Sequence, residues 1–248
     1  RGLGDVYKRQ KKMSPFDKNS IYGMYNRTEN YQSDCSYISQ IKAFKDNVSI
    51  KSCLSYTFSV SNSQGASLIK DRPFTAEMTR SIMLLKEKPY RPRMADYRIG
   101  VFFTGREQLG EGAKTTAPVY YANRWDIQPS DTAAYLRGEK VKPTKQIVFY
   151  IDNTFPEKWK PYLREGVTQW NELFEQIGFK DVVAAKDFPT DDPEFDPDNI
   201  KYSCVRYAPS SIENAMGPSW VDPRSGEILN ASVYLYHNAV SYTHLTLP

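Results

Sequence analysis

The chain has 248 residues, of which 40% are hydrophobic and 14% aromatic, enough for a real core in one or two domains. Its 33 Lys and Arg residues against 29 Asp and Glu residues give a net charge of +4, which indicates neither a nucleic-acid nor a membrane-surface partner. No apolar run approaches the roughly 18 residues of a membrane span. The three widely spaced cysteines predict neither a disulfide framework nor a zinc cluster.

The two ends of the chain resemble translated sequencing adapter. Residues 1–10, RGLGDVYKRQ, match one frame of a transposon-tagmentation adapter, and residues 240–248, VSYTHLTLP, match the reverse complement of its companion. Scars of this kind are set aside before the fold is considered. We therefore expect a natural insert of about residues 11–239, cut from a longer protein, and two tails that pack against nothing.

The first half of the insert predicts a β-rich domain over residues 11–140. Residues 11–46 are polar and without sustained periodicity, and predict a loop with at most one helical turn. Beyond them, alternating or β-rich runs predict antiparallel strands at 47–60, 80–85, 99–104 and 119–125. Residues 62–65 form a turn signal, and residues 128–145 read as a connector, so we place a domain boundary near 140.

A cluster of charges in this half, Arg91, Arg93, Asp96 and Arg98, offers two interpretations. It could bind an anion, or it could be a solvated and internally paired face. The second interpretation is favoured because surface charges pair with one another more often than they form sites.

The second half is organised around one strand and one helix. Residues 147–151, IVFYI, form a short apolar run typical of a strand buried on both faces. Pro161 suits the first position of a helix, and Gly178 suits its left-handed C-cap. Between them, apolar residues recur on one helical face at Leu163, Val167, Trp170, Phe174 and Ile177.

Further strands follow the helix. Residues 180–185 and 200–207 predict strands on either side of an Asp- and Pro-rich loop, whose spacing lacks the pattern of a calcium site. Residues 215–221 and 228–236 flank the turn signal DPRSG and predict a hairpin. The fold class is therefore α+β or α/β: an upstream antiparallel β-rich domain, then, over 141–239, an incomplete mixed sheet with one long helix.

The residues themselves assign no catalytic or metal-binding side chain. His244 lies in the adapter-like tail, so His237 is the only natural histidine, and at a strand end it reads as a surface or packing residue. A histidine-based catalytic zinc site needs three protein ligands. The sequence shows no glycine-rich phosphate loop and no nucleophile elbow.

Resemblance to a known family goes further. Residues 150–179, YIDNTFPEKWKPYLREGVTQWNELFEQIGF, and 214–238, NAMGPSWVDPRSGEILNASVYLYHN, resemble the N-terminal half of the catalytic domain in a large bacterial zinc-dependent metalloprotease family of the metzincin type, typical of Bacteroidetes. Residues 88–103, KPYRPRMADYRIGVFF, and 120–129, YYANRWDIQP, resemble the domain of unknown function that precedes the protease in that family.

The resemblance implies zinc as cofactor and a peptide or protein as substrate, in a periplasmic, outer-membrane-associated or secreted protein. Metzincins hold zinc with His-Glu-x-x-His-x-x-Gly-x-x-His on a later helix, where zinc polarises the scissile carbonyl and activates water. That helix would lie beyond Ala239, so this chain alone should be inactive.

The same resemblance implies that an extended substrate adds a strand to the sheet edge above the cleft. We map that edge onto residues Ala215, Met216, Gly217, Pro218, Ser219 and Trp220. An ordinary hairpin arm remains an alternative for these residues. For the whole chain, a non-catalytic surface or carbohydrate-associated β module and a degenerate protease-like scaffold remain open, and the downstream reading frame would discriminate them.

Overall fold

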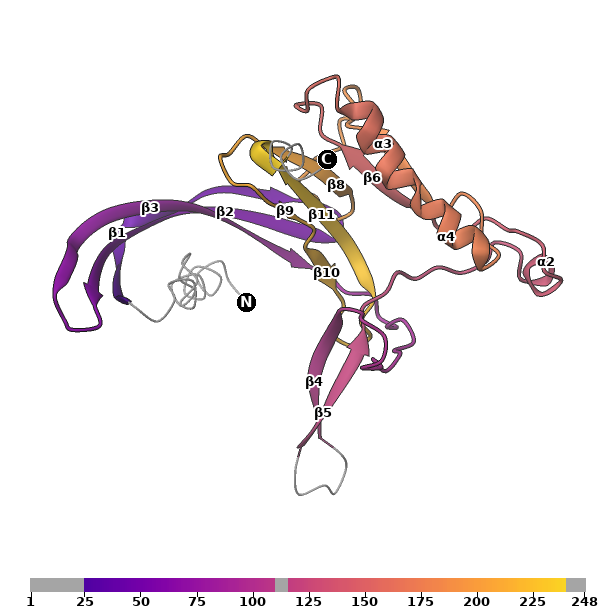
Figure 1. The fold of residues 1–248 in the computed structure, drawn as a ribbon, viewed down its shortest axis with the longest axis horizontal. Coiled ribbons are helices and arrows are strands. Elements are labelled where there is room, and N and C mark those ends of the chain that lie inside the picture. Colours follow the sequence, from indigo (N-terminus) through magenta and orange to yellow (C-terminus); the bar gives the residue numbers. More distant parts are fainter. Residues whose placement is uncertain (1–24, 110–115, 240–248) are drawn as a thin grey trace, which may run out of the picture. The chain divides into compact units, whose positions relative to one another are not determined.

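The computed structural model describes residues 25–109 and 116–239, which form two units divided between Leu84 and Leu85 (Figure 1). Both adapter-like tails lie outside the described residues. Antiparallel sheets, one mixed sheet and few helices make the protein mostly β, so the predicted fold class holds only at this coarser level. The second unit runs through residue 140, near which the sequence predicts a domain boundary.

The first unit is a three-stranded antiparallel sheet in the order β1-β2-β3. Its strands are β1 (Tyr25–Ala43), β2 (Asn47–Asn62) and β3 (Ser67–Met83). The predicted strand at 47–60 is confirmed as the central strand β2, in which Ile50 and Leu54 are fully buried. The predicted turn is also confirmed, because the Asn62 side chain accepts hydrogen bonds from the Gln64 and Ala66 amides.

Two predictions for the first unit were wrong. A loop was expected where β1 lies, and the return strand β3 begins at Ser67 rather than near residue 80. Strand β1 has no fully buried residue. A strand without a buried face needs no alternation of apolar and polar residues, so its sequence did not predict it. Its hydrogen bonds to β2 form the strand instead.

The second unit begins with a two-stranded hairpin of β4 (Phe103–Leu109) and β5 (Thr116–Ala122). The strand predicted at 99–104 begins four residues and ends five residues later than expected, and the strand predicted at 119–125 lies three residues earlier than expected. Residues 99–102 lie before the hairpin because the Ile99 amide closes a turn onto the Asp96 carbonyl. Asp96 and Arg98 form a close ion pair of 2.6 Å, in agreement with the internally paired interpretation of this cluster.

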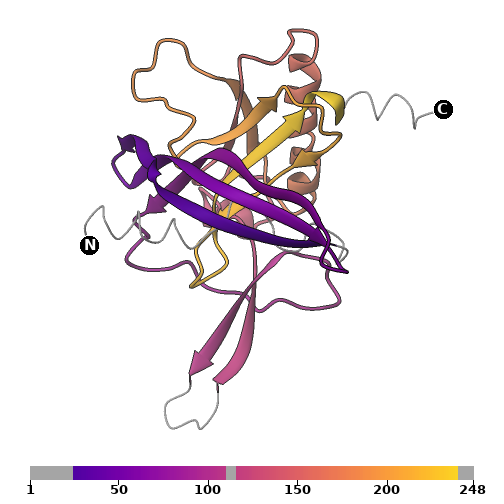
Figure 2. The ribbon, with the colours of Figure 1, turned by 90° about the vertical axis from the view of Figure 1, so that its left-hand side faces the viewer.

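The rest of the second unit is a mixed sheet in the order β10-β11-β8-β6-β7, with the short strand β9 also on β11. Its strand β11 is the long yellow strand in Figure 2. Strands β7, β6, β8 and β11 are mutually parallel, whereas β9 and β10 run antiparallel to β11. The strands are β6 (Ile147–Ile151), β7 (Val183–Asp187), β8 (Ser203–Ala208), β9 (Ala215–Met216), β10 (Ser219–Val221) and β11 (Ile228–Tyr236). The strand predicted at 147–151 and the predicted hairpin are confirmed.

The predicted long helix is divided into α3 (Lys160–Thr168) and α4 (Trp170–Gln176), which lie end to end in Figure 1. Gln169 between them keeps helical angles (φ −55°, ψ −28°), and its amide still donates to the Glu165 carbonyl at 2.9 Å. Gly178 ends the helix at φ +87°, as predicted. The predicted connector at 128–145 contains one further short helix, α2 (Thr132–Leu136), capped by Asp131.

The core of the second unit lies between the helices and the mixed sheet. Leu163, Val167 and Phe174 pack against buried strand residues, whereas Trp170 and Ile177 are more than half exposed. The predicted five-residue apolar face is therefore wrong at two positions.

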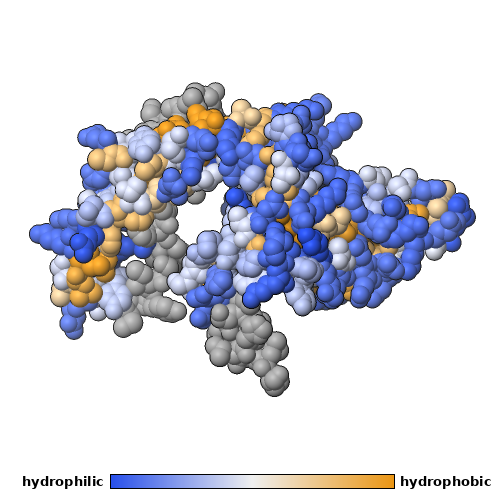
Figure 3. Space-filling view, turned by 90° about the horizontal axis from the view of Figure 1, so that it is seen from above, coloured by the Kyte–Doolittle hydropathy of each residue, from blue (hydrophilic) through white to orange (hydrophobic). Residues whose placement is uncertain are grey.

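The surface of the molecule seen in Figure 3 is largely hydrophilic, with its hydrophobic residues in small separate patches. Among the described residues, no helix is long and apolar enough to cross a membrane.

Candidate functional site: the open edge of the mixed sheet

The six residues proposed from the resemblance to bind substrate, 215–220, form one edge of the mixed sheet. We call this segment the edge arm. It consists of β9, the pair Gly217–Pro218, and the first two residues of β10, and all six residues are exposed. Within the described part of the chain no further strand pairs with β9 or β10 beyond β11. The edge position predicted for the arm is confirmed, and substrate binding stays a prediction.

The register of the edge arm decides which of its backbone groups face outward. Met216 pairs with Tyr234 and Ser219 with Ala231, and the Ser232 amide donates to the Pro218 carbonyl at 2.9 Å. Pro218 therefore faces β11, and because it lacks an N–H it cannot return a hydrogen bond. This missing bond separates β9 from β10.

The same register places the backbone of Gly217 and Ser219 on the outer side of the arm. Successive residues of an antiparallel strand direct their N–H and C=O groups alternately toward and away from the partner strand. Because Pro218 faces β11, its two neighbours face away. The arm thus keeps an outer row of donors and acceptors, although it contains a proline.

The side chains of the edge arm also alternate. Val233 and Leu235 pack against the same buried cluster as Leu163 and Val167 of α3. A Cβ on Gly217 would lie 3.9 Å from Val233 Cγ2, so Gly217 shares this face. The small residues Ala215, Gly217 and Ser219 therefore lie on the α3 face, and the larger Met216, Pro218 and Trp220 lie on the opposite face.

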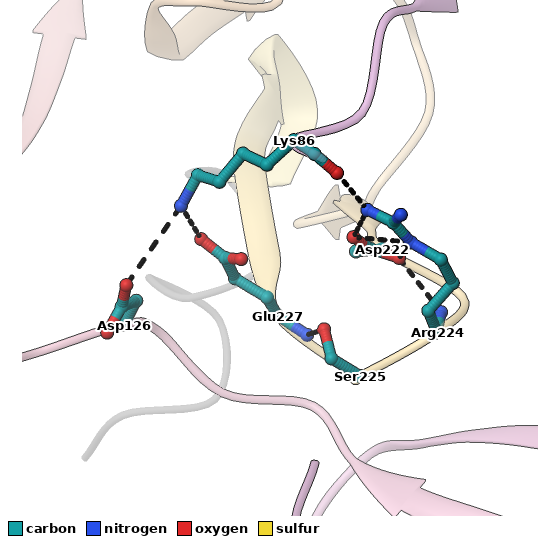
Figure 4. Close-up of polar contacts among 6 residues, drawn as sticks. All are labelled: Lys86, Asp126, Asp222, Arg224, Ser225 and Glu227. Atoms are coloured by element: carbon teal, nitrogen blue, oxygen red, sulfur yellow. Dashed lines mark hydrogen bonds and ion pairs between the residues drawn. The ribbon is translucent and has the colours of Figure 1, made fainter. Parts of the chain in front are cut away.

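The turn that follows the arm is built around the buried residue Asp222. Its carbonyl accepts the Gly226 amide at 2.9 Å, and Gly226 adopts φ +76°, a conformation that favours glycine. The Arg224 guanidinium donates to the Asp222 carboxylate, with Nη2 and Oδ2 2.8 Å apart (Figure 4). This hydrogen bond lowers the pKa of Asp222 below its usual value and raises that of Arg224.

Charged contacts join this turn to the segment that precedes the hairpin. Arg224 Nη2 donates to the Lys86 carbonyl at 2.6 Å, and Lys86 Nζ lies 2.7 Å from Glu227 Oε1 and 4.0 Å from Asp126 Oδ2 (Figure 4). Glu227 is almost fully buried, so the ammonium group of Lys86 compensates a carboxylate that has lost most of its water. The cluster is suited to holding the turn in place.

Backbone hydrogen bonds strengthen this junction. The Arg124 amide donates to the Gly226 carbonyl at 2.9 Å, and the Ile228 amide donates to the Arg124 carbonyl at 2.8 Å. A Cβ on Gly226 would lie only 2.5 Å from the Ala122 carbonyl oxygen. The sequence predicts the turn from its composition, but these partners lie about a hundred residues away and could not be predicted.

His237 lies at the carboxyl end of β11, where the adjacent strand β8 also ends. Its Nδ1 is 2.5 Å from the Tyr207 hydroxyl, and its ring stacks on Trp159 with centroids 5.6 Å apart. The residue is exposed on its remaining side. The interpretation of His237 as a surface or packing residue agrees with this arrangement.

The described residues do not fit the zinc ion that the resemblance implies. Within 25–109 and 116–239, no three His, Cys, Asp or Glu side chains gather where they could hold a metal. Tyr207 occupies one ring nitrogen of His237, and burial raises the pKa of the Cys204 thiol to about 12, which keeps it protonated. The resemblance assigns the ligands to a segment after Ala239.

Comparison with known proteins identifies the family of the upstream part. The family described as Domain of unknown function (DUF5117) matches residues 5–130, just over half of the 248 residues, and the chain belongs to this family. No curated protein and no solved structure matches the chain. The family description states no activity, and the matched residues end before the edge arm.

Proposed function

We propose that the intact protein is a zinc-dependent peptidase, and that the edge arm holds its substrate as an added, extended strand. The peptidase part of this proposal rests on the resemblance of residues 150–179 and 214–238, and the observation that carries strand addition is the outward backbone of Gly217 and Ser219. An extended peptide offers the complementary groups, and its main chain supplies affinity whatever its side chains are.

The spacing of the outward groups supports this choice of ligand. Gly217 and Ser219 are two residues apart, which in a strand is roughly 6.6 to 6.8 Å. A peptide in the β conformation repeats its bonding residues at the same distance. One peptide residue can therefore pair with Gly217 while the next but one pairs with Ser219.

In this proposal the residues of this chain bind and orient the peptide, and the bond-breaking chemistry would come from the zinc-binding segment that the family resemblance implies. A bound zinc ion would supply Lewis-acid activation there. The arm contributes backbone groups, the three apolar side chains of Met216, Pro218 and Trp220, and no side chain with the acid or base strength of a carboxylate or an imidazole. Its role is to fix the direction and depth of the peptide.

Strand addition can be tested on the 248-residue chain with a labelled peptide that is N-methylated at every second residue. Such a peptide keeps one hydrogen-bonding edge and does not form sheets with itself. We expect fluorescence anisotropy to show binding, and a peptide methylated at every residue not to bind. Ser219→Pro removes one outward N–H and leaves the hydrogen bonds to β11 intact, so it should weaken binding roughly fivefold.

Ser219→Ala is the matched control, because it removes the hydroxyl group and keeps the N–H. It should bind the peptide as the unmodified chain does, and both variants should melt at the same temperature. Equal affinity of the proline and alanine variants would overturn the strand-addition proposal.

A further inference from the structure

We infer that the edge arm selects peptides with apolar side chains at every second position, through the ridge formed by Met216, Pro218 and Trp220. This inference rests on the proposed function and adds the substrate class that the same edge would prefer. It follows from the alternation of the arm and from the contrast between its two faces.

The apolar ridge is accessible. Met216 is 52% exposed and Trp220 is 36% exposed, although both pair with residues of β11 on their inner side. Pro218 lies between them on the same face and is also exposed. The three side chains thus form a continuous apolar strip along the outer strand of the sheet.

An added antiparallel strand would lay its own side chains beside this strip. Antiparallel pairing is the more stable arrangement, and directly opposed residues bring their Cβ atoms within about 4.5 to 5.5 Å on the same face. If peptide residues bond to Gly217 and Ser219, the residue between them opposes Pro218. The two peptide residues that flank these three then oppose Met216 and Trp220.

The α3 face of the arm offers few side-chain contacts to a bound peptide. Ala215, Gly217 and Ser219 carry a methyl group, a hydrogen atom and a hydroxymethyl group. Peptide side chains on that face meet no large side chain of the arm. The preference for apolar side chains should therefore arise only at alternate positions of the peptide. Those are the peptide residues whose N–H groups point away from the arm.

N-methylation makes this preference measurable, because it fixes which edge of the peptide can bind. Two seven-residue peptides of Leu and Thr are compared, both N-methylated at positions two, four and six. The first has Leu at the methylated positions and Thr elsewhere, and the second has the reverse arrangement. The first should bind about fivefold more tightly, because only its leucines lie against the ridge.

Trp220→Ser and Met216→Ser should remove the difference between the two peptides, and Ser219→Pro should weaken both alike. Equal binding of the two peptides, with both still weakened by Ser219→Pro, would overturn the ridge and leave strand addition standing. Tighter binding of the second peptide would likewise overturn the ridge as assigned. Binding that Ser219→Pro does not affect would overturn strand addition as well.

Discussion

The two edges of the mixed sheet, β7 on one side and β9 with β10 on the other, differ in whether side chains bond to their outward backbone groups. At the β7 edge, the Asn171 side chain of α4 donates to the Val183 carbonyl at 2.9 Å and accepts the Val183 amide at 2.8 Å. One neutral amide thus satisfies the outward backbone of a buried strand residue. At the other edge, no described side chain bonds to the outward groups of Gly217 or Ser219. Helix α4 thus covers the β7 edge at Val183, whereas the opposite edge stays accessible at Gly217 and Ser219.

This difference shows that the open edge is a local property of residues 215–220. Exposed sheet edges invite aggregation, and short edge strands reduce that hazard. Strands β9 and β10 have only two and three residues, against five in β7. Pro218 keeps them short by interrupting the inner hydrogen bonds, and it leaves the outer groups available to a ligand.

The largest expected effect comes from opening the closed edge. Asn171→Leu keeps the size of the side chain but leaves the N–H and C=O of the buried Val183 unpaired, which should lower the free energy of unfolding by about 2 to 4 kcal/mol. Urea denaturation followed by tryptophan fluorescence measures this, since all four tryptophans lie in the second unit. Gln176→Leu, at an exposed position of α4, should change little. Equal losses in both variants would mean that Asn171 does not close the edge.

A smaller effect is expected from obstructing the open edge in the intact protein. Gly217→Val should lower kcat/KM roughly tenfold, or about 1.4 kcal/mol, because branched carbons would stand beside the docked peptide. Zinc content and melting temperature should not change, since no ligand is altered and Val233 leaves room for a Cβ. Peptide hydrolysis, metal analysis and a thermal melt would measure all three. An unchanged kcat/KM, or a loss fully explained by unfolding, would remove the substrate assignment.

The smallest effect is expected on lowering the pH. The turn beside the open edge is held by a charged carboxylate, which acid protonates, whereas the closed edge is held by a neutral amide, which acid leaves unchanged. The pKa of Asp222 is lower in the folded chain, so its stabilising contribution is complete above about pH 3.9 and is lost as the pH falls through the folded value. The Arg224 amide donates to Asp222 Oδ1 at 2.8 Å, whereas the Val183 amide donates to the neutral Asn171 side chain. Hydrogen exchange, corrected for intrinsic rates, should therefore show the Arg224 amide losing protection severalfold at low pH while the Val183 amide keeps it. In Asp222→Asn the Arg224 amide should show no such pH dependence. Equal losses at both amides would indicate global acid unfolding instead.

Sequence predicted well those elements whose signal lies in their own residues. The run at 147–151 is apolar on both sides and became β6 without any shift. Gly178 ended its helix for the same reason, because the left-handed conformation that it adopts favours glycine. Strand β1 shows the opposite case, since its polar residues are ordered by pairing with β2, and nothing local to the strand records that pairing.

In the candidate site, too, features set by local sequence were predicted and features set by distant partners were not. Pro218 predicted an edge, and an edge was found, but which side of the strand the proline faces depends on the register with Ser232. The closing role of Asn171 was missed because a single asparagine in a helix gives no sign of the strand that it contacts. Residues 99–102 misled for another reason, because an apolar run normally indicates burial and here Phe102 is 89% exposed.

The short backbone ladder between Arg124 and the residues around Glu227 has a consequence for how such proteins can be recombined. A hybrid made by joining the upstream part of one relative to the downstream part of another at residue 130 would place a foreign strand end against the tightly fitted Gly226. Residues 86–126 and 222–228 are joined by these contacts although the family match ends between them, so we expect that they must be exchanged together. A functional exchange would have to carry both stretches from the same parent.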